Sequence, residues 1–205
     1  MWKTEVVTPI PKVPHPTSLK QLRKICGTSD YSKLYESFIK QWIIEDVYPN
    51  IDPSQYGDEK GIGTEHILVY FLDRILKMLD SPKGKSAVIA ASCDWSEAFD
   101  RQDPFITTVK FIKLNLRPSL VTVLISYMSN RKMIVKWRGK VSTQRGLVGG
   151  SAQGSLLGGS QYIVGSSDVG SEIPYDDKYR YFDDLEVLEL IMLSGLLINH
   201  DVEVG

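Results

Sequence analysis

The stretch Tyr181-Phe182-Asp183-Asp184, near the C-terminal end of the chain, places two acidic residues side by side after two aromatic ones. A second acidic stretch, Asp94-Trp95-Ser96-Glu97-Ala98-Phe99-Asp100, follows the apolar run Ala87-Val88-Ile89-Ala90. An aromatic-x-Asp-Asp string alone is most often a solvated turn, because Asp favours turns for backbone reasons. A tight turn between two strands would nevertheless project both aspartates together, and Asp94, at the end of a neighbouring strand, could meet them across the sheet.

Three converging carboxylates have a specific chemical use. Nucleotidyl transfer by two divalent ions needs carboxylates that hold the ions about 3.5–4 Å apart. One ion lowers the pKa of the attacking hydroxyl, and the other screens the leaving pyrophosphate. Asp94, Asp183 and Asp184 are therefore the candidate catalytic residues and metal ligands.

Further motifs stand in a fixed order around these aspartates. Between the two acidic stretches lies the small-residue loop Gly149-Gly150-Ser151-Ala152-Gln153-Gly154-Ser155-Leu156-Leu157-Gly158. Before them stand, in order, Pro9-Ile10-Pro11-Lys12, Leu22-Arg23-Lys24-Ile25, Ser32-Lys33-Leu34-Tyr35-Glu36 and Gln55-Tyr56-Gly57. In this order, from Trp2 to about Leu193, the chain resembles the reverse transcriptase domain of non-LTR retrotransposons.

The resemblance implies an α+β fold, a polymerase palm in which helices back an antiparallel sheet, with partial fingers and no thumb. Residues from 1 to about 85 would be mostly fingers, and residues from about 86 to 193 mostly palm. The implied activity is RNA-directed DNA polymerisation, with Mg²⁺ as cofactor and Mn²⁺ as the alternative ion. The implied partners are an RNA template, a DNA primer and deoxynucleotides, together with a thumb or other domains of a longer polyprotein.

The resemblance also implies a nucleotide pocket. In such enzymes an aromatic residue five positions after the first aspartate, here Phe99, excludes the ribose 2′-hydroxyl. A fingers arginine, here Arg23 with Lys12 nearby, grips the triphosphate, and the Gln-Gly-Ser loop packs beneath the templating base and the nucleotide. The implied nucleotide-binding residues are Lys12, Arg23, Phe99, Gln153, Gly154 and Ser155.

Three positions depart from the family pattern. Lys24 stands where the family has the proline of Arg-Pro-Ile, and Ala152 and Gly159 replace the two prolines that flank the nucleotide loop. Proline fixes φ near −65°, so its loss loosens a loop. These departures keep an alternative open, in which the chain is a non-catalytic relic that only binds nucleic acid or has no activity.

The glycine-rich loop also allows a second interpretation, a phosphate cradle of the nucleotide-binding kind. The loop lacks the Gly-Lys-Ser/Thr ending of a P-loop, does not fit Gly-x-Gly-x-x-Gly, and is not flanked by a parallel βαβ pattern. Small residues there fit a close backbone approach to a base or a primer end.

Composition and charge agree with one folded unit. The chain has 205 residues, 42% of them hydrophobic, and a formal net charge of −1. Lys20, Arg23 and Lys24 form one basic cluster, and a second basic cluster lies between Arg131 and Lys140. The second cluster is either a surface that binds nucleic acid or the polar face of a hairpin that turns at Arg138-Gly139.

The remaining signals concern compartment. The cysteines, Cys26 and Cys93, form no metal or disulfide pattern, and Cys93 is interpreted as a buried small residue of a strand. No signal peptide and no apolar run of about 18 residues occurs, so neither secretion nor membrane insertion is expected. An intracellular location follows, with nucleus and cytoplasm left open.

Periodicity predicts the principal elements. Helices are expected from Ser32 to Val47, from a cap at Thr64 to near Ser81, from Pro104 to about Leu114 and from Pro118 to about Met128. The first would bury a stripe that consists of Leu34, Tyr35, Phe38, Ile39, Trp42 and Ile43. The second would turn inward the apolar residues Ile67, Leu68, Phe71, Leu72, Ile75 and Leu76. A strand-turn-strand from Lys178 to Leu188 would carry the aspartates.

Overall fold

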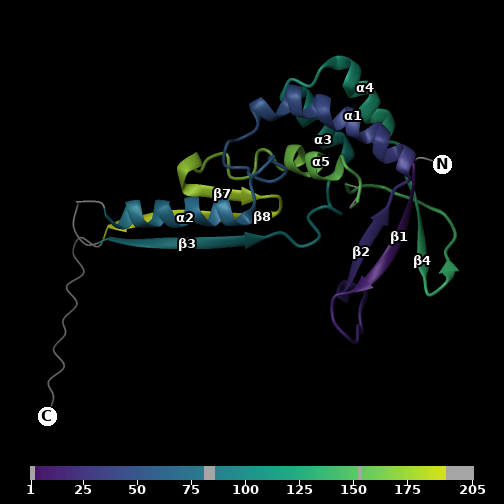
Figure 1. Ribbon diagram of the computed structural model, residues 1–205, viewed down its shortest axis with the longest axis horizontal. Coiled ribbons are helices and arrows are strands. Elements are labelled where there is room, and N and C mark those ends of the chain that lie inside the picture. Colours follow the sequence, from purple (N-terminus) through teal and green to yellow (C-terminus); the bar gives the residue numbers. More distant parts are fainter. Residues whose placement is uncertain (1–2, 81–85, 152–153, 193–205) are drawn as a thin grey trace, which may run out of the picture.

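A computed structural model describes residues 3–80, 86–151 and 154–192 (Figure 1). The helices are α1 (Asp30–Val47), α2 (Thr64–Leu79), α3 (Pro104–Lys113), α4 (Pro118–Met128) and α5 (Gly158–Gly165). The strands are β1 (Thr4–Pro11), β2 (Leu22–Gly27), β3 (Ser86–Asp94), β4 (Lys132–Trp137), β5 (Lys140–Val141), β6 (Arg145–Gly146), β7 (Lys178–Tyr181) and β8 (Asp184–Met192).

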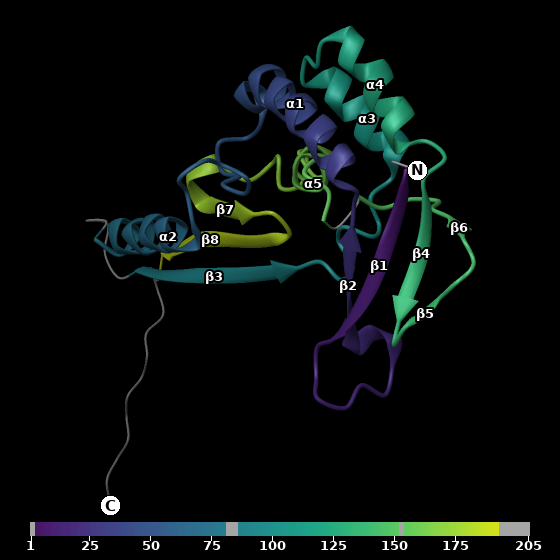
Figure 2. The ribbon, with the colours of Figure 1, turned by 45° about the vertical axis from the view of Figure 1, so that its right-hand side comes forward.

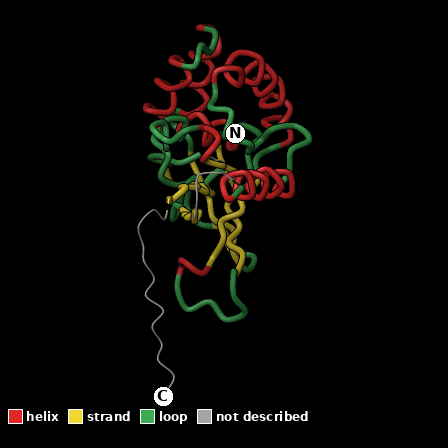
Figure 3. Tube along the Cα trace, turned by 90° about the vertical axis from the view of Figure 1, so that its left-hand side faces the viewer, coloured by secondary structure: helices red, strands yellow, loops and turns green. Residues whose placement is uncertain are grey.

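The first sheet is built on the hairpin of β1 and β2. It has the order β2-β1-β4-β5, and β6 also pairs with β4. β1 and β2 are antiparallel, whereas β4 runs parallel to β1 with Thr4 opposite Lys132. The long loop between β1 and β2 forms the end of this sheet farthest from the helices (Figure 3).

The second sheet carries the candidate catalytic residues. Its order is β3-β8-β7 and all pairs are antiparallel. α2 lies along this sheet, where Met78, Tyr179 and Leu188 form a small buried cluster. The predicted strand-turn-strand is therefore confirmed, with β8 extending beyond the predicted Leu188 to Met192.

The main hydrophobic core lies among the helices, and Figure 2 shows α1, α3 and α4 above the place where the two sheets meet. Its members come mainly from α1, α3, α4 and the α5 segment and include Ile39, Ile43, Phe111, Leu124 and Leu157, all at most 1% exposed. Side-chain caps define two of these helices. The Ser29 hydroxyl accepts a hydrogen bond from Ser32 N at the start of α1, and Asp103 accepts from the first amides of α3, where Pro104 takes the first helical position.

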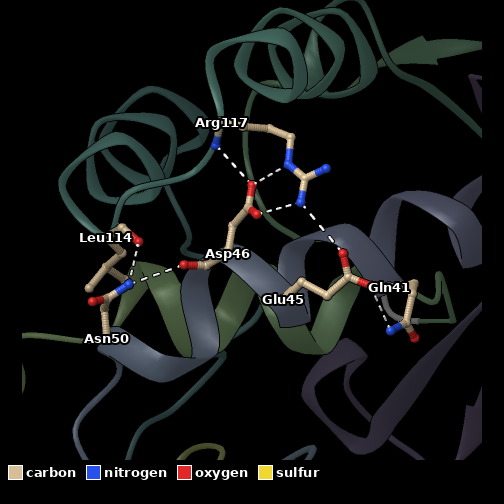
Figure 4. Close-up of polar contacts among 6 residues, drawn as sticks. All are labelled: Gln41, Glu45, Asp46, Asn50, Leu114 and Arg117. Atoms are coloured by element: carbon tan, nitrogen blue, oxygen red, sulfur yellow. Dashed lines mark hydrogen bonds and ion pairs between the residues drawn. The ribbon is translucent and has the colours of Figure 1, made fainter.

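A polar cluster ties the end of α1 to the junction of α3 and α4 (Figure 4). Arg117 donates to Asp46 from Nε at 2.6 Å and from its backbone N at 3.0 Å. The hydrogen bonds from Arg117 hold the pKa of the Asp46 carboxyl below its usual range. Asn50 Nδ2 donates to the carbonyls of Asp46 and Leu114, both at 3.1 Å, so one short stretch fixes three helix ends.

The predicted buried stripe of α1 is only partly right. Ile39 and Ile43 are buried, but Leu34, Tyr35, Phe38 and Trp42 are 41–60% exposed. The helix instead turns Ser32, Glu36, Ile39, Ile43 and Val47 inward, so its buried side begins with two polar residues. Glu36 accepts hydrogen bonds from Tyr127 of α4 and from Leu156 of the glycine-rich loop. These bonds require Glu36 to point inward, so α1 buries a different side from the one that its apolar residues alone would predict.

Three further expectations need correction. On α2, Ile67, Phe71 and Ile75 pack against the small buried cluster as expected, whereas Leu68, Leu72 and Leu76 are 49–61% exposed rather than inward. The helix packs on the sheet with one side only, so these three leucines lie on its uncovered side. Thr64 is the first residue of α2, while its N-cap is Gly63. Cys93 is exposed rather than buried, because β3 is an edge strand of the sheet and is exposed from Ile89 to its end at Asp94.

The second basic cluster forms the predicted hairpin. β4 and β5 are joined through Arg138 and Gly139, which have φ of 49° and 78° as hairpin turns of the primed kind require. Arg131 belongs instead to the interior, where its Nε donates to Glu5 Oε1 at 2.9 Å. The predicted boundary near residue 85 stays a prediction, and the first sheet takes strands from both sides of it.

Within the described ranges, no helix combines the length and apolar character that a membrane span requires.

Candidate active site

Two of the three candidate carboxylates face each other across the second sheet. Asp94 is the last residue of β3 and pairs directly with Asp184, the first residue of β8. Directly paired residues of antiparallel strands project to the same face, with Cβ atoms about 4.5–5.5 Å apart. The next pair on that face, Ser92 and Glu186, is joined by a hydrogen bond of 2.5 Å from the serine hydroxyl to the carboxylate.

The third carboxylate lies on the turn between β7 and β8. Tyr181 pairs with Asp184, so Phe182 and Asp183 form a two-residue hairpin loop. Phe182 has φ of 54°, a left-handed conformation that is costly for a residue with a side chain. The predicted arrangement of an aspartate pair on a tight turn next to Asp94 is therefore present.

The electrostatics of the site agree with a concentration of negative charge. Burial, followed by the charges of Asp183, Asp94 and Glu186, raises the pKa of the Asp184 carboxyl. Like charges that repel one another in this way are relieved by a bound cation. Among the described residues, however, no group of three or more acidic, histidine or cysteine side chains is close enough to hold a metal ion. Carboxylate oxygens remain the donor type that Mg²⁺ and Mn²⁺ prefer.

Phe99 packs next to the aspartate turn. Its ring stacks on Tyr162 of α5, with 4.5 Å between centroids, and lies 6.3 Å from the ring of Phe182. Its backbone carbonyl accepts a hydrogen bond from Ser151 N at 2.8 Å. Phe99 therefore connects the Asp94 segment, α5 and the aspartate turn, while its role in excluding a 2′-hydroxyl stays a prediction.

The glycine-rich loop is fastened to the segment that follows Asp94. Besides the bond from Ser151 N, Gly150 N donates to Gln102 O at 2.7 Å. Beyond residues 152–153, which include the predicted site residue Gln153 and lie outside the described residues, Gly154 rests against strand β2. A Cβ on Gly154 would lie 2.0 Å from Cys26 O, and its φ is 117°, so only glycine fits there.

Glu36, a residue of α1 to which the sequence assigned no role, anchors the far side of this loop. Its side chain is fully buried. One carboxylate oxygen accepts hydrogen bonds from Ser32 Oγ at 2.7 Å and Tyr127 OH at 2.8 Å. The other accepts from Ser155 Oγ at 2.9 Å and Leu156 N at 2.8 Å. In the sequence Glu36 closes the motif from Ser32 to Glu36, but the resemblance assigned it no role and the predicted apolar stripe did not include it.

The basic residues of the fingers hairpin are distributed over two faces. Lys24 is ion-paired with Asp100 at 2.8 Å, on the side of β2 that meets the Asp94 segment. Arg23 is its neighbour on the strand and therefore projects to the opposite face, and Lys12 lies at the loop end of the hairpin, away from Cys26 and Gly154. The structure thus places Lys24 against Asp100, and the triphosphate-binding roles of Arg23 and Lys12 stay predictions.

Two of the three departures from the family pattern lie near the site: Lys24, which pairs with Asp100, and Gly159. Gly159 lies in the first turn of α5, where a Cβ would lie 3.1 Å from Cε1 of Phe182. The glycine therefore leaves room for the ring of the aspartate turn. Ala152 lies outside the described residues.

Comparison with known proteins supports the family read from the motifs. No protein-family model matches the chain. Two curated transposon proteins of Drosophila melanogaster are similar to it in sequence. The probable RNA-directed DNA polymerase from transposon BS is 30% identical over 192 residues, 91% of this chain and 20% of that protein. The probable RNA-directed DNA polymerase from transposon X-element is 29% identical over 171 residues, 82% of this chain and 18% of that protein.

The fold is found in telomerase. The apo telomerase of Candida tropicalis superposes with a TM-score of 0.66 at 15% identity, covering 91% of this chain and 39% of that one. A form truncated from its C-terminal domain gives 0.62 at 13% identity, with 91% and 44% coverage. The predicted α+β fold of polymerase palm and fingers is confirmed. This chain, which spans about one fifth of the transposon proteins it matches, is homologous over most of its length to the RNA-directed DNA polymerases of non-LTR transposons.

Proposed function

We propose that this chain is the catalytic core of an RNA-directed DNA polymerase that extends a DNA primer on an RNA template with deoxynucleotides. The observation that carries the proposal is the direct pairing of Asp94 with Asp184 next to the turn that holds Asp183. The 30% identity to the probable transposon BS polymerase over 91% of this chain supports the same activity.

In this proposal Asp94, Asp183 and Asp184 hold two divalent ions, Mg²⁺ or Mn²⁺, which activate the primer hydroxyl and screen the leaving pyrophosphate when bound. The chain's own residues position the reactants. Phe99 stands beside the aspartate turn, where its ring can border the sugar of an incoming nucleotide. Gly154 and Ser155 offer the surface beneath the base, and Glu36 holds this segment through the Ser155 hydroxyl and Leu156 N. Lys24 of β2 is ion-paired with Asp100, six residues after Asp94.

A second candidate is a relic that folds without catalysing the reaction. It is favoured by one observation, the absence among the described residues of three metal-binding side chains in close proximity. The two candidates differ in what a duplex and divalent ions do to the chain. The polymerase should gather the three carboxylates on ions, and the relic should not.

Primer extension in a chimera tests the proposal, because the relatives are about five times as long as this chain. This chain would replace the matching segment of the transposon BS polymerase, and extension of a DNA primer on an RNA template would be followed with Mg²⁺ present. We expect cDNA synthesis that is lost in the D94N chimera and kept in the matched control E97Q. A folded chimera that makes no cDNA although it binds the duplex would favour the relic.

A further inference from the structure

The motif Gln55-Tyr56-Gly57 lies against the strand that leads into the aspartate turn. Ser54 O accepts a hydrogen bond from Arg180 N at 2.8 Å, and Tyr56 N donates to Arg180 O at 2.9 Å. Gln55 thereby forms a parallel bridge with Arg180, so this segment lengthens the second sheet beyond its edge strand β7. Residues that are distant in the sequence therefore flank the turn directly.

The side chain of Gln55 reaches the turn itself. Its Oε1 accepts hydrogen bonds from Phe182 N at 3.2 Å and from Gly57 N at 2.9 Å. The residue is 7% exposed, and its Nε2 has no hydrogen-bond partner within the described part of the chain. A buried amide with an unpartnered N–H carries a desolvation cost, so the acceptor oxygen is the group that the fold uses.

The bond falls on the residue of the turn that is in an unfavourable conformation. Phe182 takes φ of 54° at the first position of a two-residue hairpin loop, where glycine is the favoured residue. Without support, a chain with phenylalanine there would populate other turn conformations, and the two aspartates that follow would move with it. An acceptor on Phe182 N favours the turn that is observed.

Gly57 makes this contact sterically feasible. A Cβ on Gly57 would lie 2.8 Å from Phe182 N and 2.9 Å from Gln55 Oε1. Any larger residue would push the segment away from the turn, so the spacing of glutamine and glycine follows from the approach of two backbones.

The segment is fixed on both sides of Gln55. On one side, Asp52 is ion-paired with the buried Lys178 of β7 at 2.5 Å. On the other, Asp58 accepts from Lys40 Nζ and from Tyr48 OH, both at 2.7 Å. Because both ends are held, Gln55 presents its oxygen from a rigid support.

We propose that Gln55 is a positioning residue that holds the Phe182-Asp183 turn in its left-handed conformation and thereby sets the placement of Asp183 and Asp184 for divalent-ion binding. This inference rests on the proposed function for its metal-binding consequence. The contact with the turn stands on geometry alone.

A double-mutant cycle tests the role, with Q55M as the isosteric change that removes the acceptor. Amide hydrogen exchange at Phe182 is measured by NMR, and the Mn²⁺ dissociation constant by EPR on the 205-residue chain. We expect Q55M to speed exchange at Phe182 about tenfold and to weaken Mn²⁺ binding about fivefold to tenfold, the effect of roughly one hydrogen bond. The matched control is Q161M, which changes another buried glutamine with an unpartnered Nε2, in α5. It should leave both quantities unchanged.

The second side of the cycle is F182G, because glycine adopts positive φ without cost. In the F182G background the Q55M change should no longer weaken Mn²⁺ binding, whereas a general packing defect would persist there. The proposal is overturned if Q55M leaves exchange at Phe182 unchanged, or if its effect on Mn²⁺ is the same in both backgrounds. If the unaltered chain binds no Mn²⁺, the proposed function fails, and the exchange measurement still decides whether Gln55 holds the turn.

Discussion

The buried carboxylate of Glu36 allows a stability prediction to be worked from the structure. Replacing it with leucine removes the acceptor of four donors: Ser32 Oγ, Tyr127 OH, Ser155 Oγ and Leu156 N. Hydroxyls can rotate and pair with one another, and those of Tyr127 and Ser155 are already 2.8 Å apart. The backbone N–H of Leu156 has no such freedom, and it loses the acceptor that it has among the described residues.

The magnitude follows from these unequal losses. One unpaired N–H costs about 1–3 kcal/mol, and lost bonds to a charged acceptor add roughly another 1–2 kcal/mol after the hydroxyls re-pair. We expect E36L to lower the free energy of unfolding by about 2–5 kcal/mol, a large share of the roughly 5–15 kcal/mol of a typical domain.

The matched control is E36Q. Its amide oxygen can accept from Leu156 N, while its NH₂ donates to the hydroxyls of Ser32 and Tyr127, which can accept. We expect a loss of only about 1 kcal/mol. Urea unfolding followed by circular dichroism, with equal m-values required, gives both numbers. A loss below about 0.5 kcal/mol for E36L, or equal losses for the two variants, would refute the argument that Leu156 N depends on this carboxylate.

Three further outcomes are expected. R131M should lower the free energy of unfolding, measured in urea, by about 3–5 kcal/mol, because it leaves the buried carboxylate of Glu5 unpaired. The double variant E5L/R131M should recover most of that loss, because it removes the unpaired charge as well. Burial, followed by the charge of Glu5, raises the pKa of the Cys26 thiol to about 12, so at pH 8 only roughly one Cys26 thiol in ten thousand is ionised. Iodoacetamide should therefore label the exposed Cys93 first, and labelling of Cys26 should rise with pH. Equal labelling of both cysteines in the folded chain would contradict the burial. In the chimera, F99V should admit ribonucleotides while the rate with deoxynucleotides changes less, and an unchanged preference would exclude Phe99 as the gate.

Local patterns predicted most of the elements because their signals are local. Pro104 and Pro118 mark the first helical positions of α3 and α4, and Arg138-Gly139 marks a hairpin turn. The face that each helix buries could not be read in the same way. On α1 the polar Glu36 is buried and Phe38 is exposed, because the orientation depends on hydrogen-bond donors from α4 and the glycine loop.

In the candidate site, too, residue types and their order could be predicted from the sequence, whereas contacts between distant segments could not. The aspartates were found because their residue types and order carry the chemistry, and the sheet register pairs Asp94 with Asp184 as expected. Strand β2 was not predicted from the sequence. The sequence therefore did not indicate that the side chains of Arg23 and Lys24 project to opposite faces of the sheet. The contact of Gln55 with Phe182 joins residues 127 positions apart, and no single-sequence pattern encodes such a distance.

Calorimetric titration of the 205-residue chain with Mg²⁺ and Mn²⁺ tests the central claim, that these carboxylates form a divalent-ion site, most directly. Like charges that raise the pKa of Asp184 should be relieved by the ion, so binding should release heat or protons and should stabilise the fold. The account predicts binding that D94N, D183N and D184N each abolish and that E97Q, on the neighbouring loop, leaves intact. Binding that is unchanged in D94N and D184N, or no binding by the unaltered chain at millimolar ion, would contradict it.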